Sequence, residues 1–185
     1  MIIRKLFKFE NAHIVRKCTT KRCSQNVHGH SYKVEVLLES NFLDNGQMVY
    51  DFGLVKQYMK EIIDSFDHAI TLWSGDSLEY LEDMKKHSLR WIELPVSPSA
   101  EQFSRVIFIL VDKLLQNSTF NNGEKEVYIN SVIVHETDTG YAQAFKKDAY
   151  SHLMGVIELE KIIFSKQIQD EWTNKQIYHN LLTIH

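Results

Sequence analysis

The chain has 185 residues, which suits one compact domain or one domain with an appendage, and 44% of them are hydrophobic while 24% are charged. This composition supports a sizeable core and argues against a disordered chain. The formal net charge of -3 offers no basic field for a nucleic-acid backbone, and no apolar run approaches the roughly 20 residues that cross a bilayer. We therefore expect a cytoplasmic protein with neither nucleic acid nor membrane as a partner.

Two strands are predicted near the start of the chain. Residues 2–9 and 31–39 alternate apolar and polar side chains, which is typical of strands with one buried face. We expect the two strands to pair as neighbours. Residues 10–30 between them are polar and turn-rich and contain both cysteines and three of the nine histidines, so the chemistry is expected there.

Two helices are predicted next along the chain. Asp51 is a good N-cap for a helix that ends near Asp67, and Ser99 in SPSAEQF can cap a second helix with Gln102 at the reciprocal position. In both helices, apolar residues recur at three- and four-residue steps and therefore share one face. These residues are Val55, Met59, Ile62 and Phe66 in the first helix, and Phe103, Ile107, Leu110 and Leu114 in the second.

A second strand pair follows the turn at residues 121–123, formed by VYINSVIVHE (127–136) and YAQAF (141–145). The order strand, strand, helix, helix, strand, strand indicates an α+β domain: an antiparallel four-stranded sheet with two helices on one face. Residues 71–95 are predicted to form a long connection, with a short helix at LEYLEDMKK. We expect a domain of residues 1–145 and a helical C-terminal extension of residues 146–185.

Three histidines predict a metal site. His28 and His30 are two residues apart at the start of a strand, so their side chains point to the same face. His13 follows the first strand. If the strands pair, the three imidazoles converge and leave one coordination position of a zinc ion open, as in catalytic zinc sites. The alternative is that these are polar loop histidines with no ligand role.

Cys23 lies five residues before His28 in the same loop, close enough in sequence to face a metal-bound substrate. It could instead be a fourth zinc ligand that closes a structural site. Cys18 is the other cysteine of this loop. A reducing compartment argues against a disulfide between the two.

Two further groups are candidates for acid–base chemistry and binding. Asp67 and His68 end the first helix, and an Asp beside a His can orient the ring for proton transfer; a His stabilised by the helix dipole is the simpler reading. Glu136 ends an apolar strand and is followed by Thr137. Its carboxylate suits the paired N–H donors of a guanidine-like ring edge, or is simply solvated at a turn.

Taken in order, the segments FENAHIV, Cys23 with VHGHSYKVEV, MVYDFGLVK, FDH, SPSAEQ and VIVHETDTGYA resemble the family of 6-pyruvoyl-tetrahydropterin and 6-carboxytetrahydropterin synthases over residues 2–145. The resemblance implies a T-fold whose hairpins join those of neighbouring subunits in a barrel, usually a trimer stacked as a hexamer, with active sites between subunits. It also implies roles for single residues. His13, His28 and His30 would bind Zn²⁺, Cys23 would abstract protons, and Asp67 and His68 would complete its relay. Glu136, with Thr137 beside it, would bind the pterin, and Glu136 would also contribute to the proton relay.

The substrate implied by the resemblance is 7,8-dihydroneopterin triphosphate, with its side-chain hydroxyls on zinc. In the bacterial branch, which FENAHIV and HGHSYKVEV resemble more closely, a lyase releases acetaldehyde and triphosphate and forms 6-carboxy-5,6,7,8-tetrahydropterin for 7-deazaguanine and queuosine biosynthesis. The other branch eliminates triphosphate and forms 6-pyruvoyl-tetrahydropterin.

Two alternatives remain at this point. Bacterial members usually place the cysteine four residues before HGH, whereas the spacing here is five, so Cys18 is a second candidate for the base. A rival from another class is a non-catalytic, zinc-stabilised assembly module with Cys23 as the closing ligand. The presence of Asp67, His68 and Glu136 argues against that module, because a structural site needs none of them.

Overall fold

The computed structural model describes residues 1–175 and 181, without the side chains of residues 56–58. A mixed sheet of seven strands runs through the molecule in the order β6-β5-β2-β1-β3-β4-β7. Its strands are β1 (Ile2–His13), β2 (His28–Glu39), β3 (Ala69–Trp73), β4 (Trp91–Leu94), β5 (Tyr128–His135), β6 (Tyr141–Phe145) and β7 (Ile163–Phe164). The long hairpin of β1 and β2 pairs over its full length, from Ile2 opposite Glu39 to His13 opposite His28.

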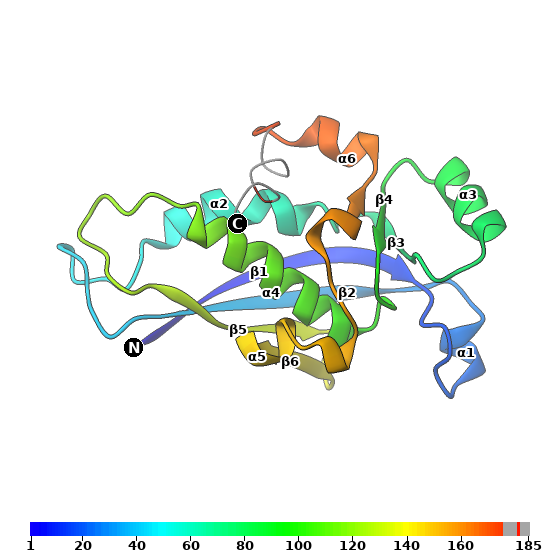
Figure 1. Ribbon diagram of the computed structural model, residues 1–185, viewed down its shortest axis with the longest axis horizontal. Coiled ribbons are helices and arrows are strands. Elements are labelled where there is room, and N and C mark those ends of the chain that lie inside the picture. The colour runs from blue at the N-terminus through cyan, green and yellow to red at the C-terminus, as the bar shows by residue number, and fades with distance from the viewer. Residues whose placement is uncertain (176–180, 182–185) are drawn as a thin grey trace.

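The two long helices, α2 (Phe52–Asp64) and α4 (Ala100–Gln116), cover one face of the sheet (Figure 1). Both predicted N-caps are confirmed: the Asp51 carboxylate accepts the Gly53 amide, and the Ser99 hydroxyl accepts the Gln102 amide. The remaining helices are short: α1 (Lys21–Ser24), α3 (Leu78–His87), α5 (Lys146–Ala149), α6 (Lys166–Glu171) and two 3-10 turns at His152–Met154 and Leu159–Lys161. Within residues 1–175, no helix has the length and apolar content to cross a membrane.

The core forms between this helical face and the strands. Phe7 and Phe9 on β1 and alternate residues of β2 are buried, while the residues between them face the other side. The apolar faces of α2 and α4 close over these strand residues. The residues buried in this core include Tyr32, Val34, Val36, Leu38, Met59, Ile62, Phe66, Phe103, Ile107 and Leu110.

The predicted strand count of four is wrong. Residues 71–95 are not a simple connection, because β3 and β4 lie there, parallel to β1 and to each other. Four of the five residues in β3, AITLW, are buried, so the strand shows no polar alternation and gives no period-of-two signal. The predicted short helix is α3, whose Leu81 packs with Ile70 and Leu72 in a second, smaller cluster.

The segment after residue 145 crosses the helical layer and adds β7 to the sheet edge beside β4. Ile162, Phe164, Ile168 and Trp172 belong to the main core. The segment is therefore packed on the domain by its apolar side chains, through short helical turns and one short strand. The division of the chain at residue 145 stays a prediction.

Arg105 of α4 anchors the first part of this segment. The residue is 3% exposed, and its guanidinium donates to the carbonyls of Asp148 (2.8 Å), Ala149 (3.2 Å), Ser151 (2.7 Å) and Gly155 (2.8 Å), and to that of Met154. One side chain thus satisfies five backbone acceptors, which fixes residues 148–155 against α4.

We expect Arg105→Ala to lower the free energy of unfolding by about 3 kcal/mol or more, because buried carbonyls lose their donor. Urea denaturation followed by circular dichroism measures this change. Arg4→Ala is the control, since the Arg4 side chain is 58% exposed and pairs with Glu35 at the surface; its loss should cost at most about 1 kcal/mol. Equal effects of the two substitutions would contradict the anchoring role.

Candidate metal centre

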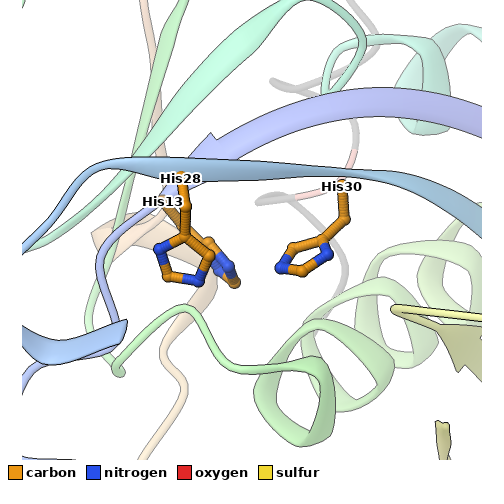
Figure 2. Close-up of side chains that lie close together, drawn as sticks. All are labelled: His13, His28 and His30. Carbon is orange, nitrogen blue, oxygen red and sulfur yellow. The ribbon is translucent and has the colours of Figure 1, made fainter. Parts of the chain in front are cut away.

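Three histidines converge where β1 ends and β2 begins. The strand register places His13 directly opposite His28, and His30 follows two residues later on the same face. Figure 2 shows the three rings on one side of the two strands. One nitrogen from each ring lies within 4.8 Å of the other two. A tetrahedral zinc site needs separations of roughly 3.4 Å, which follows from Zn–N bonds of about 2.0–2.1 Å, so small side-chain rotations complete the ligand set.

His13 is the most constrained of the three. It is fully buried, its Nδ1 lies 2.6 Å from the Pro98 carbonyl oxygen, and its ring stacks on Phe103 at an interplanar angle of 14°. A donating Nδ1–H leaves Nε2 with a free lone pair, the arrangement typical of metal-bound histidine. Burial lowers the pKa of His13 to about 4, so the ring is neutral near pH 7 and ready to bind metal.

Glu136 faces the histidines from the end of β5. Its Oε1 lies 3.7 Å from His13 Nε2 and 3.8 Å from His30 Nε2. The main chain after it turns back sharply, since the amides of Glu136 and Thr137 both donate to the Gly140 carbonyl. The structure therefore places the Glu136 carboxylate beside two of the three candidate ligands, His13 and His30.

Thr137 has its hydroxyl within this turn. Its Oγ1 accepts the Gly140 amide at 3.0 Å and the Thr139 amide at 3.4 Å. The side chain thus stabilises the loop that holds Glu136. Its role in binding a substrate stays a prediction.

Tyr32 was missed by the sequence reasoning. It is fully buried, and its hydroxyl donates to Glu136 Oε1 at 3.3 Å and lies 3.3 Å from His13 Nδ1. Burial, together with the Glu136 carboxylate, raises the pKa of Tyr32 far above its ordinary value, so the hydroxyl stays protonated and remains a donor. Its position two residues after His30 on the same strand face was the available signal.

Cys23 lies in α1, within the loop that joins β1 to β2. Its carbonyl accepts the Val15 amide at 3.2 Å, and its side chain is half-buried and free of any disulfide, as is that of Cys18. Among the residues whose side chains are described, the group able to share one ion contains the three histidines and neither cysteine. This geometry does not favour Cys23 as a closing ligand.

Asp67 and His68 form a hydrogen-bonded pair in the turn after α2, which ends at Asp64, three residues before the predicted end near Asp67. Asp67 Oδ2 lies 2.9 Å from His68 Nδ1, while Oδ1 accepts the Glu10 amide at 2.7 Å. Partial burial works against the charged carboxylate, but the hydrogen bonds from Glu10 and His68 outweigh it, so the pKa of Asp67 lies below its usual value. His68 adopts a left-handed φ of 50°. Asp67 therefore orients the exposed ring of His68.

This pair lies across the sheet from the three histidines. His68 lines a pocket of about 440 Å³ together with Glu10, Ser31 and His30. The side chains of Glu10 and Ser31 hydrogen bond to each other at 2.7 Å. Glu10 and Ser31 alternate with Phe9 and Tyr32, which face the helices. Within one chain, the side chains of Glu10 and Ser31 beside His68 thus lie on the sheet face opposite to the one that carries the imidazoles of the candidate metal ligands.

Arg90, a second residue that the sequence reasoning missed, holds the segment that carries this pair. Its guanidinium donates to the carbonyls of Asp64 (3.0 Å) and Asp67 (2.9 Å) and pairs with Glu171 of α6. Trp172 adds a hydrogen bond from Nε1 to the Ser65 hydroxyl at 2.8 Å. The segment after residue 145 therefore supports the end of α2.

Loss of a residue that only orients a metal ligand typically weakens metal binding roughly 10–100-fold. We expect His13→Ala, His28→Ala and His30→Ala each to weaken zinc binding by more than this, because each substitution removes a ligand. Metal content by mass spectrometry and competition with a chromogenic chelator measure the effect. His152→Ala is the matched control, since His152 is exposed and outside the cluster. Zinc retained at full affinity in the three variants would refute the proposed ligand set.

Known proteins resemble this chain in sequence and in fold. A family model described as 6-pyruvoyl tetrahydropterin synthase matches residues 2–147. A 6-carboxy-5,6,7,8-tetrahydropterin synthase of Helicobacter pylori strain J99 is 41% identical over 184 residues, covering 99% of this chain and 92% of the relative. One of Aquifex aeolicus strain VF5 is 30% identical over 157 residues, covering 76% of this chain and 95% of the relative.

Solved structures share the fold at lower identity. An uncharacterized protein of Wolinella succinogenes has a TM-score of 0.61 at 21% identity, covering 79% of this chain and 98% of that protein. A 6-pyruvoyl tetrahydropterin synthase of Plasmodium falciparum has a TM-score of 0.58 at 19% identity, covering 78% and 98%. The α+β T-fold prediction is confirmed by these neighbours, apart from the strand count. By its sequence and its fold, the chain belongs to the 6-pyruvoyl tetrahydropterin synthase family.

Proposed function

We propose that this protein is a zinc-dependent lyase, a 6-carboxy-5,6,7,8-tetrahydropterin synthase. It would convert 7,8-dihydroneopterin triphosphate to 6-carboxytetrahydropterin with release of acetaldehyde and triphosphate, a step towards 7-deazaguanine and queuosine. The relatives from Helicobacter pylori and Aquifex aeolicus carry this enzyme name. The observation that carries the proposal is the convergence of His13, His28 and His30 with the Glu136 carboxylate beside them.

The donor set fits zinc. Three imidazole nitrogens lie within reach of one ion, His13 is oriented by the Pro98 carbonyl, and a fourth position is left for the substrate, as in catalytic sites. When bound there, zinc would supply Lewis acidity towards the hydroxyls of the substrate side chain.

Glu136 is proposed to bind the pterin ring. Its carboxylate can accept two parallel hydrogen bonds from the guanidine-like edge of the pterin. The Tyr32 hydroxyl and the turn closed by Gly140 fix its position. The ring would thereby be anchored beside the metal, with the side chain of the substrate directed at the three histidines.

Cys23 is proposed as the proton-abstracting base, with Cys18 as the second candidate, and Asp67 with His68 as its relay. His68 Nδ1 faces Asp67, which leaves Nε2 of the same ring for proton exchange. The non-catalytic module is less well supported, because it needs Cys23 as a ligand and uses neither His68 nor Glu136.

The enzyme is further proposed to be a homo-oligomer, a trimer or hexamer, with each site shared between two copies. Residues 2–9 of β1 have no strand on the side away from β2 in the part of the chain that the structure describes, since β3 pairs with residues 11–13 alone. β6 forms the opposite edge of the sheet. Open edges favour pairing with another chain, and pairing between copies would allow His68 of one copy to reach the metal centre of the next.

Incubation of the zinc-loaded protein with 7,8-dihydroneopterin triphosphate is expected to release acetaldehyde, which an alcohol dehydrogenase assay detects. Elimination of triphosphate with formation of 6-pyruvoyl-tetrahydropterin, and no acetaldehyde, would assign the chain to the other branch. Absence of both products would leave the non-catalytic module as the better reading.

Cys23→Ala is expected to lose turnover by at least the roughly 10²–10⁴-fold that a general base contributes, while zinc content stays unchanged. Cys18→Ala is the matched control, because its thiol lies in the same loop. Loss of zinc in Cys23→Ala would mean that this cysteine is a ligand, and full activity would transfer the role of base to another residue.

Shared sites can be tested by mixing two inactive variants, His13→Ala and His68→Ala, under conditions of subunit exchange. If each site takes its metal ligands from one copy and His68 from a neighbour, random mixing restores about one quarter of wild-type activity, since one site in four then receives both intact halves. Light scattering after chromatography reports the oligomeric state. No recovery from a fully exchanged mixture would show that each site lies within one chain.

A further inference from the structure

A polar residue interrupts the apolar stripe of β1. Alternate residues of this strand face the helical layer, and Phe7, Phe9, Asn11 and His13 are all buried there. The two phenylalanines belong to the core and His13 to the candidate metal centre, whereas Asn11, which is 4% exposed, belongs to neither. Burial of a carboxamide costs free energy unless its hydrogen bonds are made, so the partners of Asn11 indicate its function.

Both ends of the Asn11 carboxamide are paired with other parts of the chain. Its Nδ2 donates to the Phe66 carbonyl at 2.9 Å, and its Oδ1 accepts the Thr71 hydroxyl at 2.9 Å. Phe66 lies in the turn after α2, and Thr71 lies in β3, where it is 1% exposed. Asn11 therefore ties β1 to the chain on both sides of Asp67 and His68.

The main chain of Glu10 adds two contacts to the same pair. Its amide donates to Asp67 Oδ1 at 2.7 Å, and its carbonyl accepts the His68 amide at 2.7 Å. Two consecutive residues of β1 thus hold the turn at Phe66, Asp67 and His68. Because β1 also presents His13, one strand restrains both a candidate metal ligand and the proposed relay.

His68 adopts a conformation that needs such restraint. Its φ of 50° lies in the left-handed region, which costs free energy for a residue with a side chain and persists where the surrounding structure fixes it. Arg90 donates to the carbonyls of residues 64, 65 and 67, and Asn11 donates to that of Phe66 between them. The direction of the His68 ring therefore depends on a turn whose carbonyls these two side chains hold.

We propose that Asn11 is a positioning residue for the Asp67–His68 pair, because its carboxamide holds the turn that directs the His68 ring. This inference rests on the proposed function for the role of His68 in proton transfer. A group that moves a proton works only within hydrogen-bond reach of that proton. Loss of the Asn11 contacts should therefore slow the chemical step and leave substrate affinity and zinc binding unchanged.

Asn11→Leu in the full-length, zinc-loaded protein tests these contacts, because leucine has a similar size and suits the apolar stripe but makes neither hydrogen bond. We expect the His68 amide to exchange with deuterium at least about fivefold faster, which corresponds to the loss of about one net hydrogen bond. Mass spectrometry with electron-transfer dissociation resolves single amides and needs no substrate.

Asn122→Leu is the matched control. It makes the same change beyond the other end of β2, where Asn122 Nδ2 donates to Asp44 Oδ2 at 2.8 Å. Exchange of the His68 amide should then stay within about twofold of wild type, because effects of distant sites are independent. Equal acceleration in both variants would contradict a specific role of Asn11.

In turnover, Asn11→Leu should lower kcat at least about tenfold, since displacement of a reacting group by 1 Å can cost about 10²-fold. KM should stay within about twofold. Two variants of Thr71 separate hydrogen bonding from packing. Thr71→Val keeps the shape without the hydroxyl and should reproduce part of the loss, whereas Thr71→Ser keeps the hydroxyl and should stay close to wild type. The reverse order would assign the effect to packing and overturn the proposal.

Unchanged exchange of the His68 amide in Asn11→Leu would also overturn the proposal, and so would an unchanged kcat. Loss of zinc in this variant would mean that Asn11 acts on the metal ligands instead. Faster exchange in Asn11→Leu, combined with no turnover by the wild-type protein, would confirm that Asn11 holds the pair and would reject the proposed function. If Asn11→Leu fails to fold, the two Thr71 variants provide the same comparison of exchange and kcat.

Discussion

The register between β1 and β2 is the constraint on which the site depends. A shift of one residue would turn every side chain of one strand to the other face, and His13 would no longer share a side with His28 and His30. Both faces of the hairpin fix this register. Phe9 and Tyr32 pack in the core, and on the opposite face Arg4 pairs with Glu35 and Ser31 hydrogen bonds to Glu10.

Gly29 makes the close approach of these strands possible. A Cβ at this position would lie 2.9 Å from the Asn11 carbonyl oxygen, a backbone atom that cannot rotate away. Any side chain there would push β1 from β2 at the point where His13 stands opposite His28. The short distance between the strands therefore requires glycine between His28 and His30. The same distance sets the spacing of the metal ligands.

The sequence predicted those parts of the fold that depend on local patterns. The alternation in the hairpin, the caps Asp51 and Ser99, and the pair Asp67–His68 all appear as expected. β3 was missed because both of its faces are buried. Tyr32 and Arg90 were missed because their partners are distant in the chain: Tyr32 meets Glu136 104 residues away, and Arg90 meets backbone carbonyls, which have no sequence signature.

The segment after residue 145 links the two helices that position the halves of the site. Arg105 ties it to the start of α4, close to Pro98, whose carbonyl orients His13. Glu171 and Trp172 tie it to the end of α2, which leads into Asp67. The segment therefore restrains α2 and α4 relative to each other. Arg105 and the Trp172–Ser65 hydrogen bond are buried, and buried polar groups specify one arrangement when every member is satisfied. The segment therefore contributes to the geometry of the site, although none of its residues is a proposed reacting group.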